Sequence, residues 1–397
     1  MSDDTSERSE FSARDRHFFA PGAKRILAID GGGVRGVVAL AFLERIERVL
    51  ETQSGRPVRL CDHFDLIGGT STGAVIATGL ALGHKVAQIR DFYFELGSRV
   101  FKRPLLRLPG WHAKFDAGAL ARELGAIIGS RKLDSTDLQT GLGIMLKRID
   151  TGSAWILLNS PHSVFWETPD DRSFIGNRHY SLANVVRAST AAPHYFDPQE
   201  IEIAEGEPPG LFVDGGLTPH NNPSLALLLA AILPGHGLAW PTGPGNLTIV
   251  SVGAGSFHDR LNSRALRRSA AAAVALRAMI QQIGDGQELV LTLMSWFGDC
   301  AIPWPINAEI GDLASIAPPM GALFRFLRYD LMLETDWLRR SLGAAVSERT
   351  LKQLRRIDDP HAMTLLEELA KGAAQLQVLD GHWSPHVQNA VAPLAPA

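Results

Sequence analysis

Short apolar runs alternate along the chain with longer segments whose apolar residues recur at helical spacing. Each short run ends at glycine or at an acidic residue, which is typical of a buried strand. These runs occupy residues 25–30, 64–67, 211–213 and 247–252. Segments with helical spacing predict helices over 37–50, 72–82, 181–190 and 223–233. Residues 143–149 and 154–158 predict a strand pair joined by a turn that contains glycine. Strands that alternate with helices predict an α/β fold, with a mainly parallel central sheet sandwiched by helices.

The pattern changes near residue 260. Residues 264–297 and 321–377 show helical spacing without a clear strand signal, which predicts a helical C-terminal part. The first twenty residues are polar and charged. The chain is therefore expected to have a flexible N-terminus, an α/β core and a helical extension packed on that core, over residues 1–20, 21–260 and 261–397.

Composition narrows the class of protein. The 397 residues include 39 basic and 42 acidic side chains, for a net charge of −3, and this balance gives no electrostatic footprint for a nucleic acid polymer. Cys61 and Cys300 lack metal-ligand spacing, which favours free thiols in a reducing cytoplasm. The N-terminus lacks the apolar segment of a signal peptide, and no apolar stretch approaches the ~20 residues of a membrane span. We expect a soluble, cytoplasmic protein.

Three glycine-rich turns each follow a predicted strand. They read DGGGVRG at 30–36, GTSTG at 69–73 and DGG at 214–216. Because the carboxyl ends of parallel strands lie together at one edge of an open sheet, where ligands bind, we expect these turns to converge.

The second turn matches the pattern G-x-S-x-G, in which a sharp strand-to-helix turn presents a nucleophilic serine. Ser71 is that serine; the alternative is an ordinary Ser/Thr-rich helix cap. A serine nucleophile needs a base. Asp214 is the candidate for a direct Ser–Asp pair, although DGG alone is also a common turn. His220 and His236 follow Asp214, so the residue order also permits a triad that includes a histidine.

The first turn fits two kinds of site. Gly31, Gly33 and Gly36 match G-x-G-x-x-G, a dinucleotide-binding pattern, but the acidic residue expected about 20 positions later would be Glu51, near a helix end. The other interpretation is an oxyanion hole, because exposed glycine N–H groups at a helix N-terminus stabilise negative charge. Arg35 either binds an anion or, as we favour, supports the loop by hydrogen bonds.

The three motifs, in this order, resemble those of the patatin-like phospholipase family. ASTAAPHYF at 188–196 and NNP at 221–223 resemble further motifs of the family, and the likeness covers residues 25–255. The spacer LTPH between DGG and NNP makes the resemblance weaker after Gly216, but not at Asp214. The resemblance implies Ser71 as nucleophile, Asp214 as its base, and an oxyanion hole formed by Gly31, Gly32 and Gly33 with help from the Thr72 backbone. It implies no catalytic histidine, no metal and no cofactor.

The activity implied by the resemblance is hydrolysis of the ester bonds of membrane phospholipids through an acyl-enzyme. The partner would be a phospholipid membrane surface, bound peripherally on the inner face of the membrane. Residues 100–111 mix apolar with basic side chains, which fits an interfacial lid or, alternatively, a packed helix and loop.

Regulation and two alternative functions are also open. Bacterial members of the family include cyclic-nucleotide-activated effectors of antiphage defence, which this chain resembles in its layout and in FRFLRYDL at 324–331. This likeness suggests a cyclic-oligonucleotide activator. The C-terminal helices could also form a homo-oligomer interface. The alternatives are an acyltransferase with the same nucleophile, and a non-catalytic nucleotide-binding module that uses the glycine loop.

Overall fold

A single mixed sheet forms the centre of the computed structural model, which describes residues 11–101, 113–258 and 271–383 except 314 and 319. Nine strands are found in these described parts, in the order β5-β6-β3-β2-β1-β7-β9-β8, with β4 paired to β3. The strands are β1 Lys24–Ile29, β2 Leu66–Thr70, β3 Gly141–Arg148, β4 Ser153–Leu158, β5 Gln199–Ile201, β6 Gly210–Asp214, β7 Leu247–Val252, β8 Gly298–Cys300 and β9 Phe324–Tyr329. Five pairings, from β3 through β2, β1, β7 and β9 to β8, are parallel. The mainly parallel sheet is therefore confirmed.

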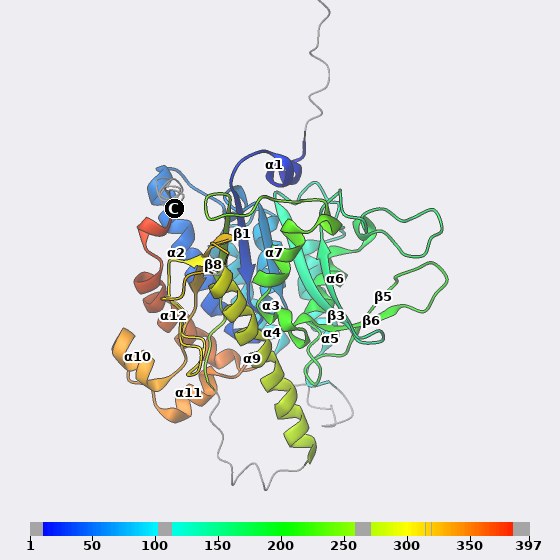
Figure 1. Ribbon diagram of the computed structural model, residues 1–397. Helices are drawn as coiled ribbons and strands as arrows, with labels where there is room; N and C mark the ends of the chain where they lie inside the picture. Colours follow the sequence, from blue (N-terminus) through cyan, green and yellow to red (C-terminus); the bar gives the residue numbers. More distant parts are fainter. Residues whose placement is uncertain (1–10, 102–112, 259–270, 314, 319, 384–397) are drawn as a thin grey trace, which may run out of the picture.

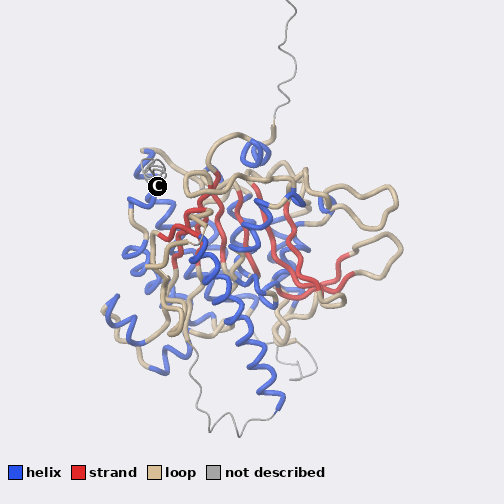
Figure 2. Tube along the Cα trace, in the orientation of Figure 1, coloured by secondary structure: helices blue, strands red, loops and turns tan. Residues whose placement is uncertain are grey.

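Helices cover both faces of the sheet (Figures 1 and 2). They are α1 Ala13–Phe19, α2 Gly36–Ser54, α3 Thr72–Ala81, α4 Val86–Val100, α5 Ala117–Ile128, α6 Leu182–Ser189, α7 Ser224–Ile232, α9 Ala271–Phe297, α10 Thr335–Leu342, α11 Glu348–Leu354 and α12 Met363–Gln377. Side chains alternate along β1. Leu27 and Ile29 pack in one core with α2, α3, α4, α6 and α12, whereas Ile26 and Ala28 pack in the other with α7 and α9. No helix in the described parts is both long and apolar enough to span a membrane.

The sheet continues beyond residue 260, which corrects one expectation. Helical spacing is predicted over 321–377, but Phe324–Tyr329 is the strand β9, buried at all six positions between β7 and β8. Two arginines in the sequence FRFLRY give it the look of an amphipathic helix. Both are buried with partners: Arg325 donates to the carbonyl of His382, and Arg328 contacts two carboxylates. The boundary expected near residue 260 therefore runs through one sheet: α9 lies beyond it, β8 and β9 follow, and only from α10 onward are all the described regular elements helices.

The N-terminus also differs from expectation. Residues 1–20 are predicted to be flexible, yet Ala13–Phe19 is a helix whose cap, Ser12, accepts a hydrogen bond from the Asp15 N–H. Phe18 is 1% exposed, and its carbonyl accepts a hydrogen bond from the Trp240 indole. One buried aromatic side chain therefore fixes a segment whose composition is otherwise polar.

The three glycine turns meet at one edge of the sheet, but not for the reason expected from parallel strands alone. Strands β1 and β2 are parallel and end side by side, with Ile29 paired to Gly69. Strand β3 extends past β2, and β6 runs antiparallel along this extension until Asp214 pairs with Leu146. Asp214 thus reaches the carboxyl edge of β2 from the opposite direction.

Candidate active site

Ser71 lies at a strained turn between β2 and α3. Its backbone has φ 55° and ψ −126°, a conformation that costs a non-glycine residue roughly 1–3 kcal/mol. The glycines on either side make this turn sterically feasible. A Cβ on Gly69 would lie 2.2 Å from the carbonyl carbon of Gly73, and a Cβ on Gly73 would lie 2.3 Å from the Ile29 oxygen. This is the strand–turn–helix context that the G-x-S-x-G pattern predicts.

Ser189, at the end of α6, holds this turn in place. Its hydroxyl accepts a hydrogen bond from the Ser71 N–H at 2.9 Å and donates one to the carbonyl of Met145 at 2.7 Å. The ASTAAPHYF motif contains Ser189, but nothing in the sequence alone indicates that this residue orients Ser71.

Ser71 and Asp214 are in direct contact. The Ser71 hydroxyl donates a hydrogen bond of 2.6 Å to Oδ2 of Asp214, and Oδ1 accepts a bond of 2.7 Å from the Gly216 N–H. The Asp214 side chain is buried, and burial raises its pKa to about 6, although the hydrogen bonds from Ser71 and Gly216 favour the ionised form. The carboxylate is thus placed to accept the proton of the serine hydroxyl. Its raised pKa makes it a stronger base than an exposed aspartate.

The two histidines that the sequence order permits in a triad do not join the Ser71–Asp214 pair. No hydrogen bond joins either ring to Ser71 or Asp214 in the described parts of the chain, and Nδ1 of both His220 and His236 is buried without a partner. Burial lowers the pKa of both rings, which favours the neutral form.

Among the glycines of the first turn, the N–H groups differ in what they contact. The Gly31 N–H donates to the carbonyl of Asn221 at 3.1 Å, so in this arrangement Gly31 offers no free donor, contrary to its expected role. The Gly32 N–H makes a long bond of 3.3 Å to the Thr72 hydroxyl. The Gly33 N–H has no acceptor among the described residues, and Gly33 lines the central cavity. Gly33 is therefore the free donor of the loop.

Close packing fixes the glycine loop. A Cβ on Gly32 would lie 2.4 Å from Cβ of Ala254, and a Cβ on Gly33, at φ +58°, would lie 2.1 Å from the carbonyl oxygen of Ile357. The Tyr93 hydroxyl donates to the Gly33 carbonyl. Glu51, the acid required by the dinucleotide interpretation, instead pairs with Lys85 at 2.5 Å. These contacts favour a rigid donor loop over a dinucleotide site.

Arg35 joins the glycine loop to the segment that follows β7. One guanidinium nitrogen donates to the carbonyl of Gly255 at 3.0 Å, and the group lies 5.3 Å from the centre of the Phe257 ring. Burial lowers the pKa of Arg35 to about 10, which still leaves the side chain charged at neutral pH.

A cavity of about 1000 Å³ opens onto Ser71, Asp214 and Gly33. Its walls come from both halves of the chain. Apolar side chains of the first half line one part: Val75, Leu96, Val100, Phe101 and Leu120. Apolar side chains beyond residue 256 line another: Phe257, Leu291, Trp304, Ile306 and Met332. Most of the lid expected at 100–111 lies outside the described residues.

Comparisons with known proteins identify the family. A family model described as patatin-like phospholipase matches residues 27–228. A cGAMP-activated phospholipase of Vibrio cholerae is 30% identical over 211 residues, which cover 50% of this chain and 55% of that protein. The rat calcium-independent phospholipase A2-gamma is 32% identical over 247 residues, covering 59% and 29%. Patatin-like protein 1 of Arabidopsis thaliana is 28% identical over 255 residues, covering 58% of each. The matches thus span 55%, 29% and 58% of the lengths of these three relatives.

Proposed function

The chain belongs to the patatin-like phospholipase family, and on this basis we propose that it is a lipid acyl hydrolase that cleaves the ester bonds of phospholipids. The observation that carries the proposal is the contact of 2.6 Å between the Ser71 hydroxyl and a buried Asp214 carboxylate, at the wall of a large, mainly apolar cavity. Together they provide a nucleophile, its base and room for an acyl chain.

In the acylation step, Oγ of Ser71 attacks the ester carbonyl carbon while its proton passes to Oδ2 of Asp214. The carbonyl π electrons move onto the oxygen, which becomes an oxyanion. As the tetrahedral intermediate collapses, the bond to the leaving alcohol breaks, and this alcohol takes the proton from Asp214. The products of this step are a lysophospholipid and an ester of Ser71 with the fatty acid.

Deacylation repeats the chemistry with water. Asp214 accepts a proton from a water molecule as the water oxygen attacks the Ser71 ester. Collapse of this second intermediate breaks the Ser71 ester bond, and Asp214 returns the proton to Oγ. The fatty acid leaves and the free enzyme is restored.

The oxyanion hole is assigned to the N–H groups of Gly33, Gly32 and Thr72. Gly33 is the free donor, Gly32 is held only by a long bond to the Thr72 hydroxyl, and the first N–H groups of α3 have no partner within the helix. The positive end of the α3 dipole adds to the stabilisation. Removal of one such donor typically lowers the rate on the order of 100- to 1,000-fold.

Covalent labelling tests the nucleophile. A long-chain alkyl fluorophosphonate would form a bond between phosphorus and Oγ of Ser71 as fluoride leaves. We expect intact-mass spectra to show one adduct on the wild type and on Ser98→Ala, which removes an exposed serine of α4. Ser71→Ala should show none. Labelling of Ser71→Ala to the wild-type extent would contradict the assignment.

We further propose that a cyclic dinucleotide activates the enzyme at a membrane surface, where its substrate lies. The name of the Vibrio cholerae relative supports this proposal. The test is fatty-acid release from phospholipid vesicles with and without cGAMP and a panel of other cyclic di- and trinucleotides. Activation by at least one compound, together with sedimentation of the enzyme with the vesicles, is expected. Identical release with every compound would contradict the proposal.

A further inference from the structure

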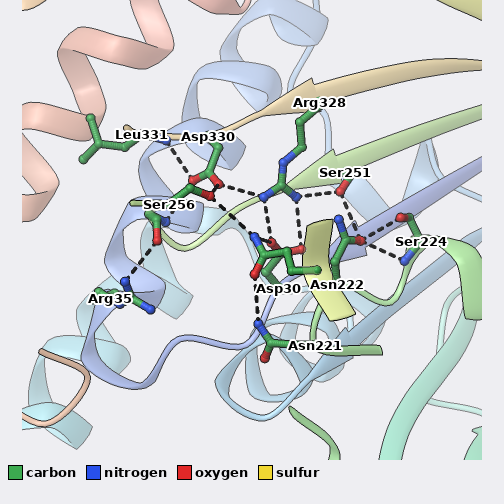
Figure 3. Close-up of polar contacts among 12 residues, drawn as sticks. Asp30, Arg35, Asn221, Asn222, Ser224, Ser251, Ser256, Arg328, Asp330 and Leu331 are labelled. Atoms are coloured by element: carbon green, nitrogen blue, oxygen red, sulfur yellow. Dashed lines mark hydrogen bonds and ion pairs between the residues drawn. The ribbon is translucent and has the colours of Figure 1, made fainter. Parts of the chain in front are cut away.

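We propose that Arg328 of β9 is a positioning residue that holds the glycine loop in the conformation of an oxyanion hole. The proposal rests on the hydrolase function proposed above. Arg328 lies 100 residues beyond the end of the family match at 228, so the match itself does not point to it. Figure 3 shows its guanidinium between β9 and the start of the loop.

Both terminal nitrogens of Arg328 donate hydrogen bonds to Asp30, the residue immediately before the glycines. Nη1 lies 3.1 Å from Oδ1 of Asp30, and Nη2 lies 2.8 Å from Oδ2. This two-point contact fixes the orientation as well as the position of the carboxylate. The Asp30 N–H also donates to the carbonyl of Val252 at 3.0 Å. Both the backbone and the side chain of Asp30 are therefore fixed where the loop begins.

Neighbouring groups hold Arg328 itself. Its Nη2 contacts Oδ2 of Asp330 at 2.7 Å, and its Nη1 donates to the Ser251 hydroxyl at 2.8 Å. Arg328, Asp30 and Asp330 are each at most 1% exposed. Buried charges are costly unless they are paired, so removal of the arginine would leave two carboxylates facing each other. Burial already raises the pKa of Asp30 to about 6, against the opposing effect of Arg328.

Two amide side chains extend this network to the peptide groups of the loop. Gln287 of α9 donates to Oδ2 of Asp30 at 3.3 Å, and Asn221 donates both to the side-chain oxygen of Gln287 at 3.4 Å and to the carbonyl of Gly31 at 3.3 Å. In a trans peptide the C=O and the following N–H point in opposite directions. Fixing the Gly31 carbonyl therefore directs the Gly32 N–H away from Asn221, to the side of Thr72.

Lysine cannot replace this contact. An ammonium group is a point charge on a flexible stem, whereas the planar guanidinium has several donors in fixed directions. Lysine at 328 would still neutralise charge but would not bridge both oxygens of Asp30 and also reach Asp330 and Ser251. Comparison of Arg328→Lys with Arg328→Gln therefore separates the effect of charge from that of geometry.

The matched control is Arg325→Gln, three positions earlier on the same buried strand. Arg325 is 9% exposed, and one terminal nitrogen donates to the carbonyl of His382. Because three positions along a strand reverse the face, its side chain points away from the Asp30 network. The control therefore measures the cost of losing a buried arginine from β9 without a change at the glycine loop.

The experiment measures kcat and KM for ester hydrolysis, thermal unfolding, and amide hydrogen exchange of peptides that contain residues 30–36. In Arg328→Gln we expect kcat to fall about 100-fold, with KM unchanged and faster exchange in the 30–36 peptides. In Arg328→Lys, kcat should fall less than in Arg328→Gln. The KM should again be unchanged, and the 30–36 peptides should again exchange faster than in the wild type. Arg325→Gln should keep the wild-type kcat and exchange of these peptides.

Each outcome decides the proposal. Wild-type kcat and exchange in a folded Arg328→Gln variant would overturn it, and so would an increase in KM alone. If Arg328→Gln does not fold, Arg328→Lys decides by the same criteria. The Ser71→Ala variant identifies a failure of the hydrolase proposal itself. If the wild type shows no Ser71-dependent turnover, exchange decides alone: faster exchange in the Arg328 variants but not in Arg325→Gln supports the positioning role, and equal exchange overturns it.

Discussion

Asp214 combines two effects of burial at the scale of a single residue. Burial raises its pKa to about 6, which makes it a stronger base for Ser71 than an exposed aspartate would be. The same burial makes the ionised form costly in the folded protein. Activity and stability should therefore depend on this one carboxyl in opposite ways.

The first prediction concerns the pH dependence of activity. Because Asp214 must be ionised to accept the serine proton, kcat/KM should rise with pH, reach half its maximum near pH 6 and stay level above pH 7. A pH–rate profile between pH 4.5 and 8.5 measures this. Burial also raises the pKa of Asp30 to about 6, so Asp30→Asn is the control and should keep the same midpoint despite lower activity. A profile that is flat down to pH 4.5 would contradict the assignment.

The second prediction is that Asp214→Asn loses hydrolysis but gains stability at alkaline pH. The folded-state pKa of about 6 lies above the usual value of 3.8. The wild type therefore has an ionisation penalty that is absent below pH 4 and complete above pH 6. Each tenfold change in acidity corresponds to about 1.4 kcal/mol, so the variant should gain about 2–3 kcal/mol of unfolding free energy at pH 8. Urea unfolding at pH 8 and pH 4 tests this, and equal loss of stability at both pH values would contradict it.

Single residues of the site differ in how far the sequence predicts them. The motifs around Ser71 and Asp214 single out the two residues that the structure brings into contact, because the required glycines are neighbours in sequence. The sequence does not show that the Gly31 N–H is already hydrogen-bonded, because its acceptor is the carbonyl of Asn221, 190 positions away. Ser189 and Arg328 are missed for the same reason: each acts on a group that only the folded chain brings near.

At the scale of elements, the glycine loop is held by hydrogen bonds to several other parts of the chain. The Gly33 carbonyl accepts from Tyr93, and the next N–H, that of Val34, donates to the carbonyl of Ile357 at 2.9 Å. The Gly33 N–H, which immediately precedes this anchored peptide group, has no acceptor among the described residues. Its direction is therefore determined by contacts with distant elements rather than by the loop sequence.

The third prediction compares two glycines with similar positive φ angles. Gly33 has φ +58° and Gly55, at the end of α2, has φ +65°, but a Cβ would meet Ile357 at 2.1 Å only at Gly33 and would find open space at Gly55. Gly55→Ala should cost about 1 kcal/mol of stability without loss of kcat. Gly33→Ala should lower kcat by about 100-fold, because the displaced loop loses a donor. Thermal unfolding and ester hydrolysis measure both, and equal kcat in the two variants would contradict the role of Gly33.

Strands that are continuous apolar runs can be predicted from the sequence, whereas a strand that carries buried arginines within it cannot. The strands β1 and β7 are apolar runs that end at polar or glycine residues, so the period of the pattern identifies them. Strand β9 is missed because two of its six buried residues are arginines with partners elsewhere in the fold. The antiparallel direction of β6 is also hidden, since it depends on the length by which β3 extends past β2.

At the scale of the whole molecule, the residues beyond 260 belong to the same sheet and line the same cavity as the candidate active site. They contribute β9 and β8 to the sheet, Arg328 to the glycine loop, and one wall of the cavity. Without them, β7 would become an exposed apolar edge, which is a site for aggregation.

The fourth prediction follows from this arrangement. A chain that ends at residue 260 should show no cooperative thermal unfolding and no fluorophosphonate labelling, because both the sheet and the loop are incomplete. The full chain, prepared in the same way, is the control. A truncated chain with a cooperative transition and Ser71-dependent labelling would show that the first 260 residues form an independent catalytic domain.

The most direct test of the hydrolase proposal is fatty-acid release from mixed phospholipid vesicles by the wild type, Ser71→Ala and Ser98→Ala, with and without cyclic nucleotides. We expect release by the wild type and by Ser98→Ala, accompanied by lysophospholipid, and none by Ser71→Ala. Equal release by Ser71→Ala and the wild type would contradict the proposed nucleophile. No release by any of the three proteins under every condition, with correctly folded samples, would contradict phospholipid hydrolysis as the function.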